Sequence, residues 1–213
     1  MTKKSLCAKC SGQKPENKFL PRSIAEYREI ILARITDFAC SDSDWHYPIF
    51  SNIAYNLQYL EYLNVCFEQL YLTSVLRAQN VKMFTLTASQ IIECLLYLKL
   101  IELKVDKNEV YDFSHALRVA SDKNAYALGP DFYRNHLKNL KDLRNKIHLQ
   151  SPIGMAEADY AVFEKLEVLN EVKSVLFLFL QKTLKLPTEK MYQLFYFLMP
   201  TEAFIHSKDL NYE

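Results

Sequence analysis

The residues with the clearest chemical potential lie in one segment, Asp131 to Gln150. Within it, Arg144 and His148 are one helical turn apart, so a helix would place them on the same face. A histidine can accept or donate a proton near physiological pH, and an arginine keeps its charge and binds phosphate oxygens. The pair therefore suits phosphoryl transfer without a metal. His148 would move the proton, and Arg144 would stabilise charge on the phosphorane.

A basic surface is predicted beside this pair. On a helical projection of about 100° per residue, one arc carries polar side chains and the opposite arc faces a buried seam. The polar arc contains Arg134, Lys138, Lys141 and Asn145. We expect the first three to bind an anionic substrate. The same projection places His136 on the apolar side. The plainer interpretation, a solvated basic face with one histidine, stays open.

Several amphipathic segments must position these residues. Helical spacing predicts helices over 24–39, 49–79, from 87 through 100, 113–121, 131–150, 156–185 and 189–199. Capping-box patterns, Ser23 to Glu26 and Thr87 to Gln90, mark two of the predicted starts. Helices with short connections predict an all-α bundle of five to six main helices. We divide the chain into an N-terminal arm plus one helix (1–47), a bundle (48–186) and a C-terminal short helix and tail (187–213).

The run Leu143 to Leu149, late in an all-α bundle and followed by one long helix, resembles the HEPN superfamily. The resemblance covers roughly residues 50–185 and rests on this short motif together with its helical context. It implies a small helical bundle that dimerises, so that the motif helices of two copies form a composite site. Many members are metal-independent endoribonucleases of toxin–antitoxin and antiviral defence systems. Others have lost activity and serve as binding modules, for example beside a nucleotidyltransferase.

Carried over residue by residue, the family motif matches Arg144, Asn145 and His148. Arg144 would bind phosphate, His148 would act as acid or base, and Asn145 would support them through hydrogen bonds. The family also tends to carry an acidic residue on an earlier helix, and Glu93 is the candidate here. One departure is the spacing, because three residues separate Arg144 from His148 instead of the usual four to six.

Composition bounds the remaining possibilities. The formal net charge is +1, which excludes a histone-like polycation, and only 3 glycines argue against a Gly-rich phosphate loop. The sequence has 5 cysteines and shows no secretory signal, so we expect the thiols to be free. We also expect a cytoplasmic protein without a membrane span. Cys7 and Cys10 have the spacing of a zinc knuckle but lack a second pair, so no cofactor is expected, with zinc as the open alternative.

Three functions follow from this sequence. The first is a HEPN-like, metal-independent endoribonuclease that acts on RNA as a homodimer, in a defence or toxin–antitoxin setting. The second is an inactive HEPN-like binding module that partners an antitoxin, a nucleotidyltransferase or a larger effector, which the short spacing favours. The third is an unrelated helical interaction protein in which the basic face is incidental.

Overall fold

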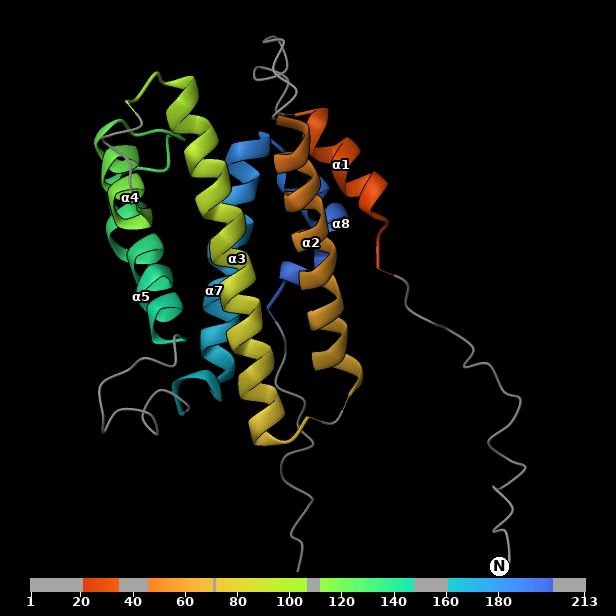
Figure 1. Ribbon diagram of the computed structural model, residues 1–213. Helices are drawn as coiled ribbons and strands as arrows, with labels where there is room; N and C mark the ends of the chain where they lie inside the picture. The colour runs from red at the N-terminus through yellow and green to blue at the C-terminus, as the bar shows by residue number, and fades with distance from the viewer. Residues whose placement is uncertain (1–20, 35–45, 71, 107–111, 148–160, 201–213) are drawn as a thin grey trace, which may run out of the picture.

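The computed structural model describes residues 21–34, 46–70, 72–106, 112–147 and 161–200, and at residues 46 and 47 it describes the backbone alone. Every regular element in these ranges is a helix, which confirms the predicted all-α class. Figure 1 shows α3 (Ser74–Glu102) and α7 (Leu166–Leu184) at the centre of the bundle. Helices α1 (Ile24–Leu32) and α2 (His46–Gln69) lie on one side, and α4 (Phe113–Asp122) and α5 (Lys138–Lys146) lie on the other.

Helix α1 begins with the predicted capping box. The Ser23 hydroxyl accepts a hydrogen bond from the Glu26 amide, and the Glu26 carboxylate accepts one from the Ser23 amide. Tyr27 and Ile31 of α1 are buried against α2. This first helix is therefore attached to the bundle through its apolar face.

The predicted boundary between the second and third helices, placed between residues 79 and 87, was wrong. Helix α2 ends at Gln69, and α3 runs without interruption from Ser74 to Glu102, through the expected start at Thr87. Thr87 and Ser89 are buried within α3, where the Ser89 hydroxyl donates to the Thr85 carbonyl at 2.7 Å. A hydroxyl can bond back to its own helix in this way, so a capping-box pattern alone does not start a helix.

The motif segment also differs from a uniform helix. Residues Phe132–Leu137 form a π-helical stretch, η4, that leads directly into α5. A π turn holds more residues than an α turn, so the projection shifts before α5 begins. His136 consequently lies at the surface and contacts Phe132, with 5.4 Å between ring centroids, contrary to the predicted apolar position. Arg134, Lys138 and Asn145 are exposed as predicted, and Lys141 is half-buried.

The C-terminal helices complete the core. The predicted helix over 156–185 is interrupted: residues 161–163 are helical, Lys165 has an extended backbone, and α7 begins at Leu166, whereas 156–160 lie outside the described residues. As expected, a break follows it, and α8 (Thr188–Leu194) leads into a short 3-10 turn, η5 (Tyr196–Leu198). Phe195 and Phe197 are fully buried and pack on Tyr27 of α1, with ring centroids 6.3 and 6.4 Å apart. The two ends of the described chain therefore share one core.

Helix α3 alone among the described helices is long and apolar enough to span a membrane by length and composition. However, 61% of its most apolar window is buried inside the bundle. A core helix of a globular protein passes the same test. Its packing against α2, α4, α5 and α7 places α3 at the centre of the bundle.

Candidate functional site

Arg144 is held by two side chains from different helices. Its guanidinium forms an ion pair with Glu93 of α3, with 3.1 Å between Nη2 and Oε2. The guanidinium also lies over the Phe113 ring of α4, 5.4 Å from the ring centroid. Side chains of both ion-pair partners are about three-quarters buried, at 24% and 21% exposed. The structure thus brings together Arg144 and the acidic residue that sequence analysis assigned to it.

The electrostatics of this pair are those of a partly desolvated site. Burial raises the pKa of Glu93, and the charge of Arg144 opposes that rise. The Nε of Arg144 is buried and has no hydrogen-bond partner among the residues that the structure describes. A buried donor without a partner is costly, so this nitrogen is an unsatisfied polar group of the pair. Arg144 therefore keeps one donor for a further acceptor.

A basic cavity lies beside this pair, between α4 and the η4–α5 helix. Its volume is about 320 Å³. It contains all three predicted substrate-binding cations, together with residues from α4. The lining residues are Ser114, Leu117, Arg118, Ser121, Asp122, Tyr133, Arg134, Lys138 and Lys141. Lys141 precedes Arg144 by one turn, so the cavity and the ion pair are neighbours on α5.

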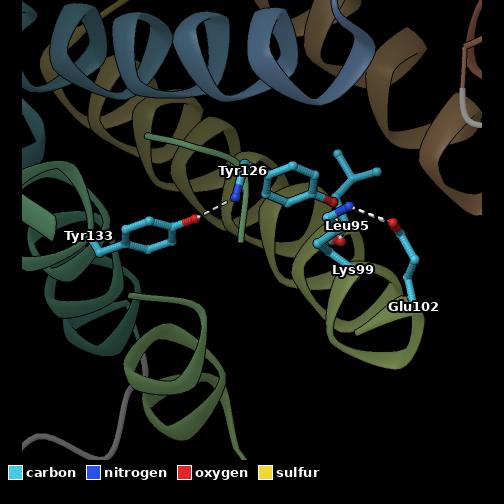
Figure 2. Close-up of polar contacts among 5 residues, drawn as sticks. All are labelled: Leu95, Lys99, Glu102, Tyr126 and Tyr133. Carbon is cyan, nitrogen blue, oxygen red and sulfur yellow. Dashed lines mark hydrogen bonds and ion pairs between the residues drawn. The ribbon is translucent and has the colours of Figure 1, made fainter. Parts of the chain in front are cut away.

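The loop between α4 and η4 fixes one wall of this cavity. As Figure 2 shows, the Tyr133 hydroxyl oxygen accepts a hydrogen bond from the Tyr126 amide at 3.2 Å. The Tyr126 hydroxyl in turn donates to the Leu95 carbonyl of α3 at 2.7 Å. The Lys99 Nζ lies 2.7 Å from Oε1 of Glu102, with which it forms an ion pair. The same Nζ lies 5.8 Å from the centroid of the Tyr126 ring. The two tyrosines therefore attach the loop and the first turn of η4 to the central helix.

Other predicted site residues have different outcomes. Asn145 is exposed at the end of α5. His148, Cys7 and Cys10 lie outside the described residues, so their roles remain predictions. Within the described ranges, no group of three or more His, Cys, Asp or Glu side chains could hold a metal. The expectation that no cofactor is needed stays a prediction from the sequence.

Sequence reasoning missed Phe113 and Arg118 as site residues. Both lie on α4, and nothing in their local pattern indicates that α4 packs beside α5. The Asp112 carboxylate caps α4 by accepting a hydrogen bond from the His115 amide at 2.8 Å, which sets the start of this helix. The local sequence around α4 shows an acidic N-cap followed by apolar residues at helical spacing. This pattern predicts a helix, but it does not predict that the helix packs beside α5.

Two further polar clusters are buried away from this site. The Glu61 carboxylate accepts the Tyr27 and Tyr196 hydroxyls, each at 2.8 Å, and the Arg22 amide at 2.7 Å. Lys173 of α7 donates to the Asn64 side chain and to the Met199 carbonyl. These contacts join α1, α2, α7 and η5. We therefore assign both clusters to the stability of the bundle.

Comparison of the chain with protein-family models, with curated proteins and with solved structures gives no match. The functional argument therefore depends on the geometry of the residues themselves.

Proposed function

We propose that this chain is a HEPN-like, metal-independent endoribonuclease that acts as a homodimer in the cytoplasm. The observation that carries the proposal is the juxtaposition of the Arg144–Glu93 pair with the basic cavity on one helix. Cations of the cavity would hold the phosphate backbone of RNA, and Arg144 would stabilise charge at the phosphorus that reacts. A defence or toxin–antitoxin role follows from the family resemblance.

The proposed reaction is an internal transesterification. The ribose 2′-oxygen attacks the adjacent phosphorus, and the bond from phosphorus to the 5′-oxygen breaks. The proton of the 2′-hydroxyl passes to one histidine, and a proton is delivered to the leaving 5′-oxygen. In a dimer, His148 of each copy is available for one of these transfers. The products are a 2′,3′-cyclic phosphate and a 5′-hydroxyl.

The test is cleavage of a mixed RNA pool in EDTA by wild type and by the His148→Ala and Arg144→Ala variants. We expect each variant to lose at least about 100-fold in rate, because a proton-transfer group or a charge-stabilising donor is removed. His136→Ala is the matched control, since His136 is exposed on η4, and it should cleave like wild type. Undiminished cleavage by His148→Ala would overturn the assignment of that residue.

A second candidate is an inactive binding module that pairs with an antitoxin, a nucleotidyltransferase or a larger effector. The observation in its favour is that Arg144 is already paired with Glu93 and stacked on Phe113 within its own chain. Together with the short Arg144–His148 spacing, this arrangement suits a structural use of the motif. RNA or protein binding without any cleavage by wild type would select this candidate.

A further inference from the structure

Helix α2 has two faces of different kinds. Its inner face, which includes Ile53, Leu57 and Leu60, is buried in the core. Along its outer face, residues follow one another at alternating spacings of three and four positions. We call this line the tyrosine seam, and its residues are Asn52, Tyr55, Tyr59, Tyr62, Cys66 and Gln69. Side chains at this spacing form the contact line between paired helices in coiled coils.

The tyrosines of the seam are open to solvent. Tyr55, Tyr59 and Tyr62 are 49%, 38% and 52% exposed. The Tyr59 and Tyr62 rings are stacked, with 6.3 Å between their centroids and 19° between their planes. Asn52 and Gln69 at the ends of the seam are also exposed. Three aromatic rings therefore lie side by side in water within about two turns of one helix.

The outer face of α2 is also without charge. Across residues 47–69 the chain has two charged residues, Glu61 and Glu68, although 24% of the whole chain is charged. Glu61 is 2% exposed and accepts its hydrogen bonds inside the bundle. The Glu68 carboxylate accepts a hydrogen bond from the buried Asn64 amide at 2.7 Å. A solvated helix face ordinarily carries charges, whereas exposed tyrosine without charge is typical of a surface that contacts another protein.

The order of residues in the seam indicates which partner fits it. Consider a second copy of α2 that runs antiparallel to the first, with a two-fold axis at the level between Leu60 and Glu61. The residues that face each other are then Tyr59 and Tyr62, Tyr55 and Cys66, and Asn52 and Gln69. Aromatic rings pack at the centre, and two side-chain amides, each with a donor and an acceptor, meet at each end. Because the face carries no charge, two copies do not repel each other. The seam is therefore complementary to itself, as a two-fold interface requires.

We propose that the tyrosine seam is an interface between two copies of this chain, formed by antiparallel α2 helices. It differs from the contact that the family resemblance implies, which joins the motif helices. Figure 1 shows α5 across the bundle from α2, with α3 and α7 between them. Contact through the seam therefore leaves the motif helix of each copy uncovered. The inference does not rest on the proposed function.

Sedimentation velocity of the purified full chain, from low to high micromolar concentration, tests the proposal. A single pair of helices makes a small interface, so we expect reversible association with a dissociation constant on the order of 10 µM. Tyr59→Glu/Tyr62→Glu places like charges at the centre of the contact and should weaken association at least about 100-fold. Both side chains are exposed, and circular dichroism can verify the fold. The matched control is Tyr192→Glu, which adds a charge at an exposed tyrosine of α8 and should associate like wild type.

A disulfide tests the antiparallel register. In Tyr55→Cys, the new thiol faces Cys66 of the second copy, so oxidation with diamide should give a covalent dimer. Peptide mass spectrometry should find positions 55 and 66 joined. Within one copy these positions are about 16 Å apart along α2, which is too far for a disulfide. The matched control Tyr55→Cys/Cys66→Ala lacks the second thiol and should lose this product.

Three results would overturn the proposal. They are a wild type that stays monomeric at high micromolar concentration, equal association of Tyr59→Glu/Tyr62→Glu and wild type, and a disulfide that joins position 55 of both copies. RNA cleavage separates this proposal from the ribonuclease. A wild type that associates through the seam but never cleaves RNA retains the interface and loses the proposed function. Undiminished association and cleavage in Tyr59→Glu/Tyr62→Glu give the opposite result.

Discussion

At the scale of single residues, the surroundings of Arg144 and Lys173 restrict both charged side chains. Arg144 is oriented by Glu93 and Phe113 before any substrate arrives. Under the proposed function, this preorganisation would reduce the cost of positioning a charge at the reacting phosphate. Lys173 is 1% exposed and is the most deeply buried cation among the described residues. Its hydrogen bonds to Asn64 and Met199 compensate only part of the lost hydration.

The buried Lys173 should make stability depend on pH. Burial lowers the pKa of this amine to about 8, and the nearby Glu68 opposes the shift. Between this value and the unfolded pKa near 10.5, the unfolded chain binds more protons, so the contribution of Lys173 to stability rises with pH. From pH 8 to 9.5 we expect a gain of about 1.5 kcal/mol in the free energy of unfolding of wild type relative to Lys173→Met.

Urea unfolding at several pH values measures this difference. The comparison with Lys173→Met is needed because other groups act in the opposite direction. Burial raises the pKa of Cys94 to about 11, so the folded state retains that proton above pH 9 and loses stability as the pH rises. A difference between the two proteins that does not change with pH would contradict the expected pKa of Lys173.

At the scale of elements, the loop from Lys123 to Gly129 determines where the motif helix begins. The Asn124 side chain accepts the Gly129 amide at 3.1 Å, and Gly129 has a φ of 77°. Ala127 also has a positive φ, 52°, which costs an L-residue with a Cβ about 1–2 kcal/mol. The anchoring hydrogen bonds of Tyr126 and Tyr133 on either side impose this conformation.

Replacing Ala127 by glycine should stabilise the protein. Glycine removes the steric cost of the left-handed conformation but adds entropy to the unfolded chain, so we expect a net gain of about 0.5–1 kcal/mol in the free energy of unfolding. The midpoint of urea unfolding provides the measurement. Ala33→Gly is the control, because Ala33 is exposed with a φ of −61°, and this change should give no gain. A loss of stability in Ala127→Gly would show that the methyl group of Ala127 stabilises the loop.

At the scale of the whole molecule, positive charge is local. The chain has a formal net charge of +1, and four of its 26 lysines and arginines line the cavity between α4 and the η4–α5 helix. Long-range attraction of a polyanion is therefore weak, and under the proposed function the binding of RNA would depend on the few cations at the cavity. Figure 1 places these helices on the side of the bundle away from α1 and α2.

The salt dependence of single-stranded RNA binding should reflect these few contacts. Four phosphate contacts predict a slope of about −3 for the logarithm of the association constant against the logarithm of salt concentration. Arg118→Ala/Arg134→Ala should reduce the magnitude of this slope to about 1.5. Fluorescence anisotropy of a labelled oligonucleotide, with His148→Ala as the protein to avoid cleavage, gives both slopes. An unchanged slope in the cavity variant would place RNA on another surface.

Local patterns in the sequence determined the helical class, the capping box of α1, the break near Pro187 and the shared face of Arg134, Lys138 and Lys141. These features depend on spacing and on residue type within one or two turns. The sequence also suggested Glu93 as the acidic partner of Arg144, through the family resemblance. Only the tertiary structure showed their ion pair, because residues 51 positions apart in the chain meet through helix packing.

Tertiary packing decided the remaining features. Thr87 continues a helix instead of starting one, because burial of α3 on several sides favours an uninterrupted element. The π turn at η4 moved His136 to the surface, and no local pattern encodes that shift. Arg118 and Phe113 joined the site because α4 packs beside α5. Sequence periodicity specifies which face of a helix is buried, whereas the identity of the neighbouring helix depends on the packing of the entire chain.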